Sequence, residues 1–219
     1  MKLLLATPTH SGQVHADYCS STLAAVAALT AAGHEVDVKI QRSSCLPRVR
    51  CELAAATLAG GYDHALLVDA DQGFAPDAPG RLLAHGLDLV GAPVQVRNAV
   101  MFNLENPRPA EDHPGLVEVD AIGTGFLLVA RAVLAAMTAA WGPWHLFEFV
   151  ASAGGVAGED HVFCLRARGL GFRIFADPGL PMRHHGSMVY DLNLLDAIEQ
   201  GYRPRPYPYQ PIPPPGARG

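Results

Sequence analysis

The stretch LLVDADQGF, residues 66–74, places two acidic residues directly after an apolar run. In an extended chain, residues two positions apart point to the same face, so the carboxylates of Asp69 and Asp71 can converge. Ligands of open α/β sheets bind beyond the carboxyl ends of the strands, and two hard oxygen donors there suit Mg²⁺ or Mn²⁺ holding a diphosphate. The alternative is a solvated turn before Gly73. The stretch therefore predicts a buried strand that ends in a metal site or in a turn.

The overall composition limits the class of protein. The 219 residues are 49% hydrophobic and 17% charged, with a net charge of −5, which fits one α/β domain. No basic stripe is visible, so tight binding to a nucleic-acid duplex is not expected. No apolar run reaches the length of about 18 residues typical of a membrane-spanning helix. We therefore expect no transmembrane segment. The four cysteines are scattered and form no CxxC pair, so we expect reduced thiols, as in a cytoplasmic protein.

Hydrophobic patterning predicts alternating strands and helices, and therefore an α/β fold with a mostly parallel sheet flanked by helices. The expected strands are residues 2–7, 34–40, 64–68, 87–92, 126–130 and 172–176, and the expected helices are residues 15–32, 47–58, 76–85, 131–140 and 160–168. Residues 97–115 read as an irregular insertion or a short hairpin, and residues 154–158 as a flexible loop. We expect one catalytic domain over residues 1–200, followed by a Pro-rich tail, residues 201–219, that is extended or disordered.

Three further motifs contain residues that could carry chemistry. Glu159 and Asp160 open a helix, where acids are stabilised by the helix dipole; they are either caps, or one orients the helix while the other is a general base. His184 and His185 are neighbours that point apart in a strand, so at most one of them can complete the coordination of Mn²⁺. The third motif is Gly123-Thr124-Gly125, which is either a tight turn or a place where the backbone approaches a sugar or an acceptor.

Taken together and in order, these motifs resemble a small glycosyltransferase with the GT-A fold, of the kind related to family 2. The resemblance covers residues 2–190 and rests on the segments Ala6-Thr7-Pro8-Thr9, Arg48-Val49-Arg50, Asp69-Ala70-Asp71, Leu89-Val90-Gly91-Ala92-Pro93, Gly123-Thr124-Gly125-Phe126, Gly158-Glu159-Asp160 and His184-His185-Gly186-Ser187.

The resemblance implies the chemistry of these positions. Asp71 is the expected direct ligand of Mn²⁺ or Mg²⁺, and Asp69 is expected to contact the ribose, the sugar, or the metal through water. His184 is the expected later metal ligand, with His185 as the second choice, and Asp160 is the expected general base of an inverting transfer. The remaining residues implied in binding the nucleotide-diphosphate sugar are Thr7, Pro8, Thr9, Arg50, Gly123, Thr124, Gly125 and Glu159.

The expected function is therefore metal-dependent transfer of a sugar from a nucleotide-diphosphate sugar to an acceptor hydroxyl. A glycan, a lipid-linked sugar, a protein and a modified nucleic acid all remain open as the acceptor. Two alternatives stay open: a nucleotidyltransferase of related fold, and a non-catalytic module that binds nucleotide sugars. The former normally has a Gly-rich basic loop after the first strand, whereas residues 7–12 contain one Gly and no Lys or Arg. Aromatic residues that could stack on a sugar, or simply pack in the core, are Trp141, Trp144, Phe147 and Phe149.

Overall fold

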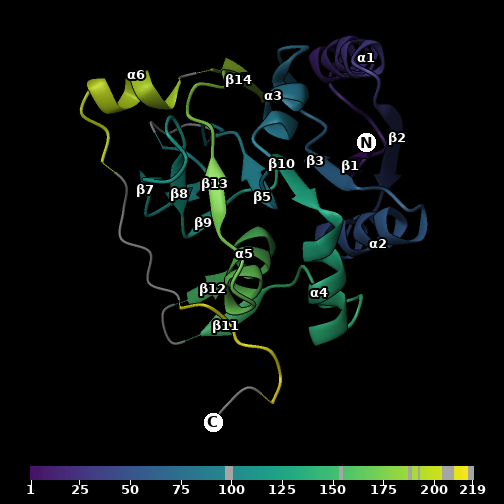
Figure 1. Cartoon of the computed structure of the whole chain (residues 1–219), viewed down its shortest axis with the longest axis vertical. Helices are drawn as coiled ribbons and strands as arrows, with labels where there is room; N and C mark the ends of the chain where they lie inside the picture. The colour runs from purple at the N-terminus through teal and green to yellow at the C-terminus, as the bar shows by residue number, and fades with distance from the viewer. Residues whose placement is uncertain (97–100, 153–154, 187–188, 192, 204–209, 217–219) are drawn as a thin grey trace.

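An eight-stranded sheet forms the centre of the protein (Figure 1). The computed structural model describes residues 1–96, 101–152, 155–186, 189–191, 193–203 and 210–216. The strand order is β2 (Glu35–Arg42), β1 (Lys2–Thr9), β3 (His64–Val68), β10 (Phe126–Ala130), β5 (Leu89–Gly91), β13 (Ile174–Ala176), β8 (Val117–Val119) and β7 (Arg108–Pro109).

Most of the central strands run in one direction. β1 is parallel to β2 and to β3, and β13 is parallel to β5. β10 is antiparallel to both of its neighbours, β3 and β5, and β8 is antiparallel to β13. The prediction of an α/β fold with a mostly parallel sheet is confirmed, and the reversal of β10 is a feature that the sequence pattern did not indicate.

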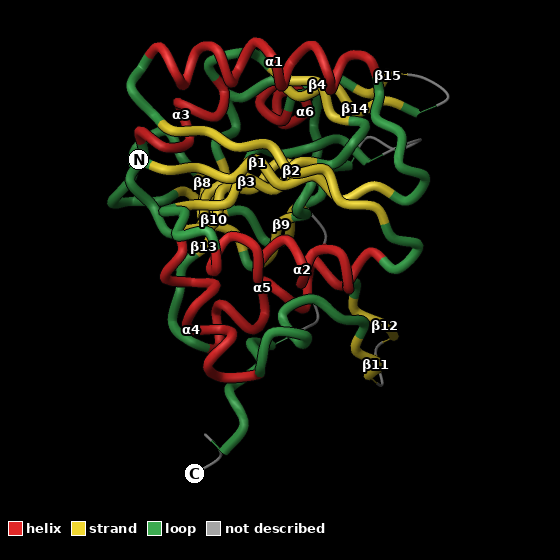
Figure 2. The backbone as a smooth tube through the Cα atoms, turned by 90° about the vertical axis from the view of Figure 1, so that its right-hand side faces the viewer, coloured by secondary structure: helices red, strands yellow, loops and turns green. Residues whose placement is uncertain are grey.

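Helices cover both faces of the sheet (Figure 2). One face carries α1 (Ala16–Ala31) and α3 (Ala78–Ala84), and the other carries α2 (Leu46–Ala59), α4 (Arg131–Trp141) and α5 (Glu159–Gly169). β1 shows why both faces are covered: Leu3 and Leu5 pack on the α1 side, whereas Leu4 and Ala6 pack on the α2 side. A strand that is apolar at successive positions must be buried on both sides, as expected for a parallel sheet.

Several predicted elements are confirmed within one or two residues. The strands over residues 64–68 and 126–130 have the predicted bounds, and the predicted helix over residues 15–32 is α1. Gly33, at φ +84°, follows this helix in the left-handed region, where glycine is favoured.

Other elements differ from the expectation. The segment expected to be a flexible loop, residues 154–158, contributes β12 (Gly155–Ala157), which pairs with β11 (Val150–Ser152) in a hairpin; residues 153–154 lie outside the described part. Within residues 97–115 the described part holds β6 (Leu104–Glu105), which pairs with β9 (Ala121–Ile122), and β7, which pairs with β8. Residues 97–100 are outside the described part.

A small three-stranded sheet lies beside the main one and was not predicted. It is formed by β15 (Val189–Tyr190), β14 (Met182–His185) and β4 (Gln72–Phe74), and it is followed by α6 (Leu194–Glu199). β4 begins directly after the two aspartates, so pairing of β14 with β4 brings the histidine motif to them. Ser187, the last residue of that motif, is outside the described part.

The chain end approaches α5. Residues 210–216 form no helix or strand, and the backbone N–H of Ile212 donates to the carbonyl of Leu165 at 3.0 Å. Ile212 also lies against Gly169, where a Cβ atom would overlap its carbonyl. Residues 204–209 and 217–219 of the predicted tail lie outside the described part. Within the described ranges, no helix combines the length and the apolar character that crossing a bilayer requires.

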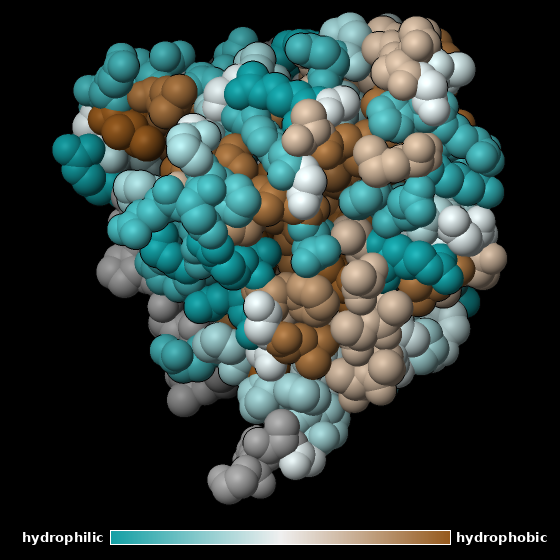
Figure 3. All heavy atoms as spheres, viewed as in Figure 1, coloured by the Kyte–Doolittle hydropathy of each residue, from teal (hydrophilic) through white to brown (hydrophobic). Residues whose placement is uncertain are grey.

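The surface mixes polar and apolar side chains. On the face drawn in Figure 3, hydrophobic residues gather along the middle and hydrophilic residues lie to either side. All four cysteines are free thiols; Cys19 and Cys45 are exposed, whereas Cys51 and Cys164 are buried.

Candidate functional site

The end of β3 and the start of β10 meet at one edge of the sheet. Because β10 runs antiparallel to β3, Phe126 pairs with Val68, and the backbone N–H of Asp69 donates to the carbonyl of Gly125 at 3.0 Å. The reversed strand therefore brings Gly123-Thr124-Gly125 beside the two aspartates. In an all-parallel sheet the start of this strand would lie at the opposite edge.

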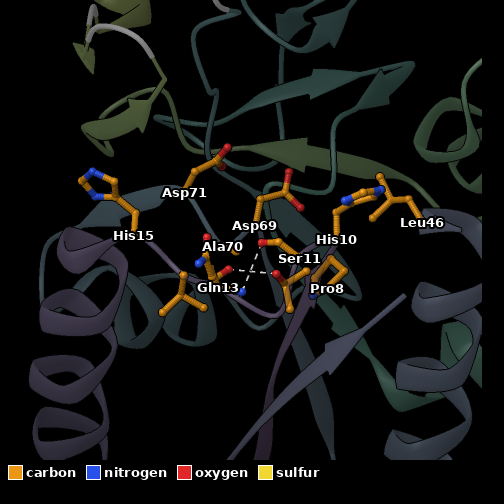
Figure 4. Close-up of a pocket in the computed structure, with 11 residues that line it drawn as sticks. Pro8, His10, Ser11, Gln13, His15, Leu46, Asp69, Ala70 and Asp71 are labelled. Atoms are coloured by element: carbon orange, nitrogen blue, oxygen red, sulfur yellow. Dashed lines mark hydrogen bonds between the residues drawn. The ribbon is translucent and has the colours of Figure 1, made fainter. Parts of the chain in front are cut away.

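The backbone of the aspartate segment is fixed by hydrogen bonds on several sides. The N–H of His15 donates to the carbonyl of Ala70 at 2.8 Å, and the N–H of His185 donates to the carbonyl of Asp71 at 2.9 Å. The N–H of Gln72 closes a turn onto the carbonyl of Asp69 at 3.1 Å. With the main chain held in this way, the carboxylates of Asp69 and Asp71 project to the same side (Figure 4).

His184 faces Asp71, and His185 does not. The Nε2 atom of His184 lies 3.8 Å from Oδ1 of Asp71, and its Nδ1 atom lies 2.8 Å from the carbonyl oxygen of Gln95. A carbonyl can only accept, so Nδ1 carries a proton and, in the neutral ring, Nε2 presents its lone pair toward the carboxylate. His185 instead stacks on His15, with ring centroids 3.8 Å apart. Of the two histidines, only His184 is placed where it could bind the same metal ion as Asp71.

Arg50 connects the aspartate segment to the start of α5. The residue is 3% exposed, and its guanidinium donates to Oδ1 of Asp69 at 2.9 Å and to the carboxylate of Glu159. Burial alone would lower the pKa of Arg50, but the neighbouring carboxylates outweigh it and raise the pKa, so the residue stays charged. The arginine that was expected to help bind the nucleotide-diphosphate sugar thus contacts two carboxylates of the protein.

Asp160 lies in the first turn of α5, next to Glu159. Its Oδ1 atom accepts the backbone N–H of His161 at 2.8 Å. Gly158, which precedes the helix, has no side chain to cap it, and a Cβ at this position would lie 3.0 Å from Oδ1 of Asp160. Glu159 is buried against Arg50, whereas Asp160 is half-buried at the cavity wall. The two neighbouring acids therefore differ in what they contact.

Two adjoining cavities meet at Asp69 and Leu46, which line both. The larger has a volume of about 450 Å³ and the smaller about 240 Å³. The larger one is lined by Pro8, Thr9, His10, Ser11, Gln13, Val14, His15, Leu46, Asp69, Ala70 and Asp71 (Figure 4). The smaller one is lined by Leu46, Arg50, Asp69, Gln72, Val94, Gln95, Val96, Asn103, Gly123, Thr124, Gly125, Glu159, Asp160 and His184.

These linings place nearly all the residues expected at the site. Pro8 and Thr9 face the larger cavity, and the Gly123–Gly125 segment faces the smaller one. Thr7 lines neither cavity: its side chain is fully buried, and its hydroxyl lies 2.6 Å from that of Tyr18. Burial raises the pKa of Tyr18, so this pair is neutral and belongs to the core.

Gly123 and Gly125, which precede β10, allow neighbouring side chains to pack closely. A Cβ on Gly123 would lie 2.5 Å from the side-chain amide of Asn103, and one on Gly125 would lie 3.3 Å from Oδ2 of Asp69. Asn103 in turn accepts the N–H of Val94 at 2.8 Å. The wall of the smaller cavity is therefore assembled from segments that are far apart in the sequence.

A second polar cluster, formed by Asp17, Arg183 and His185, lies next to the aspartate segment and was not predicted from the sequence. Arg183 donates to both oxygens of Asp17 at 2.8 Å, and Nε2 of His185 lies 2.6 Å from the same carboxylate. Gly73 packs so closely that a Cβ would overlap Asp17. The only sequence signal was an acid in the first turn of α1, which is typical of any helix. This cluster joins α1 to β4 and β14.

The site contains few side chains that could bind a metal ion directly. Among the residues that the structure describes, no group of three or more His, Cys, Asp or Glu side chains could hold a metal ion. The facing pair of Asp71 and His184 nevertheless fits a divalent ion bound together with a substrate, because Mg²⁺ in phosphate sites commonly takes one or two carboxylates and completes its shell with phosphate oxygens and water.

The aromatic residues divide into core and surface. Phe147 is buried and stacks on Phe163 with ring centroids 4.5 Å apart, and Trp141 packs beside Arg166. Trp144 and Phe149 are 58% and 61% exposed. Core packing therefore accounts for Phe147, whereas Trp144 and Phe149 remain accessible.

Comparison with known proteins shows likeness in structure and not in sequence. No family model matches the chain, and no curated protein matches it. The structure is similar to the crystal structure of A197 from STIV, with 18% identity and a TM-score of 0.56 over 85% of this chain and 86% of that one. Weaker likeness, at TM-scores of 0.43 and 0.47, extends to mannose-1-phosphate geranyltransferase from Thermus thermophilus and to a UDP-glucose pyrophosphorylase complexed with UDP-glucose. The former is 13% identical and covers 65% of this chain and 61% of its own; the latter is 10% identical and covers 90% and 95%. At these identities the comparisons establish that the chain shares the fold of A197, and they establish nothing about its chemistry.

Proposed function

We propose that the protein is a metal-dependent glycosyltransferase that moves a sugar from a nucleotide-diphosphate sugar to an acceptor hydroxyl, with inversion at the anomeric carbon. The observation that carries the proposal is the placement of three side chains around two adjoining cavities. Asp71 and His184 face each other at 3.8 Å, and Asp160 lines the same cavity as His184 from the first turn of α5.

The cavities suit the two halves of a nucleotide sugar. The larger one, of about 450 Å³, falls in the range of small-molecule sites and offers polar side chains such as Thr9, Ser11 and Gln13 to a nucleoside diphosphate. Among the described residues, its lining contains no Lys or Arg. The negative charge of a diphosphate therefore needs another partner, and a divalent cation at Asp71 and His184 supplies one.

Mn²⁺ or Mg²⁺ held there would neutralise the diphosphate and improve it as a leaving group. The proton transfer and the positioning of the reacting groups are assigned to side chains of the protein. Asp160 accepts the proton of the acceptor hydroxyl as that oxygen forms a bond to the anomeric carbon, and the bond from this carbon to the diphosphate breaks. Arg50 holds Asp69 and Glu159 in place, so the aspartate segment and the helix that carries Asp160 keep a fixed separation.

The test combines binding with turnover. The protein is mixed with UDP-glucose, UDP-galactose, UDP-N-acetylglucosamine and GDP-mannose, with and without Mn²⁺, and thermal stabilisation and release of nucleoside diphosphate are followed. We expect at least one donor to stabilise the protein only when the metal is present. Asp71→Ala should abolish metal-dependent binding, whereas Asp160→Asn should retain binding and lose transfer.

The outcomes separate the candidate functions. Release of nucleoside diphosphate supports glycosyl transfer, and formation of a nucleotide sugar from a nucleoside triphosphate and a sugar phosphate would instead identify a nucleotidyltransferase. Tight binding without turnover toward any acceptor class would identify a binding module. If Asp71→Ala and Asp160→Asn lose binding equally, the assigned roles of these two carboxylates are wrong.

A further inference from the structure

Two side-chain oxygen atoms of residues that line the smaller cavity are buried and have no hydrogen-bond partner within the described structure. They are Oε1 of Gln72 and Oγ1 of Thr124, and each residue is 1% exposed. Buried polar groups in native proteins are almost always hydrogen-bonded, because an unsatisfied one loses its interaction with water and gains nothing in return. Such a pair in one cavity wall therefore indicates a ligand that supplies the missing partners.

The two residues reach the cavity from different elements. Gln72 opens β4, where it pairs with His184 of β14, and Thr124 lies between the two glycines that precede β10. A Cβ on Gly125 would lie 3.7 Å from Nε2 of Gln72, so the amide packs beside the glycine motif. Both residues are almost fully buried, so the surrounding packing limits where their oxygen atoms can lie.

The size and chemistry of the cavity indicate what occupies it. A volume of about 240 Å³ corresponds to roughly eight water molecules at about 30 Å³ each, which is room for one sugar ring and not for two. An amide oxygen accepts a hydrogen bond from a hydroxyl, and a threonine hydroxyl either donates or accepts one. A ring that carries several hydroxyl groups meets both demands.

We propose that Gln72 and Thr124 bind hydroxyl groups of the donor's sugar ring in the smaller cavity and thereby determine which sugar is accepted. This inference rests on the proposed function and adds the specificity-determining residues to it. Gln72 was not among the residues expected from the sequence, because a glutamine after two aspartates carries no pattern of its own. A site built to hydrogen-bond a hydroxyl discriminates strongly against a ligand that lacks it or directs it elsewhere.

The test uses variants that remove the oxygen and retain the shape. Gln72→Leu and Thr124→Val are compared with wild type and with Thr57→Val, a buried threonine of α2 that lines neither cavity. Calorimetry in the presence of Mn²⁺ measures the affinity for UDP and GDP and for the four donors named above. Thermal unfolding of each variant shows whether it folds; if Gln72→Leu does not, Gln72→Met and the near-isosteric Thr124→Val carry the test.

We expect the affinity for the bare nucleotide to stay within about two-fold in every variant, while the affinity for the preferred nucleotide sugar falls at least about ten-fold in the Gln72 and Thr124 variants alone. The preference among sugars should also flatten. Unchanged sugar affinity and preference, or an equal loss for UDP and UDP-sugar, would overturn this inference while wild-type turnover still upholds the proposed function. If wild type binds no nucleotide sugar at all, the proposed function and this inference fail together.

Discussion

Removing the charge of Arg50 should destabilise the protein far more than removing that of a neighbouring surface arginine. Arg50 is 3% exposed and contacts Asp69 and Glu159, whose side chains are 34% and 10% exposed. Arg50→Met leaves Glu159 buried without a partner, whereas Asp69 can turn to solvent. Breaking a buried ion pair on one side costs about 3–5 kcal/mol, and we expect ~3 kcal/mol because only one of the carboxylates is stranded.

The measurement is urea unfolding at pH 7, together with thermal unfolding. For a chain of this size a loss of ~3 kcal/mol lowers Tm by about 6–12 °C. The matched control is Arg48→Met, two residues earlier on α2: Arg48 is 67% exposed and pairs with Glu52 one helical turn away. An exposed pair of this kind contributes about 0.3–0.5 kcal/mol.

A second variant tests the physical reason. Arg50→Met combined with Glu159→Met removes both buried charges and should recover more than half of the lost stability, because two apolar side chains of similar size need no compensation. The reasoning is refuted if Arg50→Met costs no more than Arg48→Met, or if the double variant is less stable than the single one.

Two other regions of the protein give further predictions. Hydrogen bonds from Arg183, the largest cause, hold the pKa of Asp17 well below its usual range, so this carboxylate stabilises the fold above its ordinary pKa of about 3.9 and the contribution is lost as the pH falls below that value. Asp17→Asn should therefore cost ~1–3 kcal/mol in urea unfolding at pH 7, with a smaller difference from wild type near pH 3; an equal difference at both pH values would contradict the electrostatic explanation. Burial raises the pKa of Cys51, and raises that of Cys164 to about 12, so a thiol reagent at pH 8 should label only Cys19 and Cys45 rapidly in the native protein and all four cysteines in denaturant; prompt labelling of a third thiol would show that the core opens.

The elements that could be predicted from the sequence are those with a strong local pattern. Residues 65–68 and 126–130 are continuous apolar runs, and the helix after residue 15 is Ala-rich and followed by Gly33, so each element was bounded to within one residue. β4 and β14 were missed because three or four residues of mixed polarity form a strand only through pairing with distant segments. The direction of β10 was missed for the same reason, since the same pattern suits either orientation.

The candidate site shows a similar division. Asp69, Asp71 and Asp160 could be singled out because two acids spaced two residues apart follow an apolar run, and because Gly158-Glu159-Asp160 follows them in the order of the resembled family. Asp17 and Gln72 could not, because their significance lies in what they contact: Asp17 is 166 residues away from its partner Arg183. Arg50 was singled out as a ligand-binding residue, but the sequence offered no means of seeing that its partners are the protein's own carboxylates.

The reversed strand also has a consequence for how such a protein can change over time. β5 ends and β10 begins at the same edge, where the N–H of Ala92 donates to the carbonyl of Phe126 at 3.0 Å. The chain between them therefore departs from β5 and returns to β10 at adjacent points. Its described part adds β7 and β8 to the other end of the strand order and supplies Asn103 and Thr124 to the smaller cavity. Because the free energy of closing a loop grows slowly with its length, the turns of this segment can be lengthened while the aspartates stay in place, provided that its buried residues, such as Phe102, Leu104 and Ile122, keep their packing against the core. A graft of residues 92–125 between homologous chains is thus a natural route to a new ligand preference.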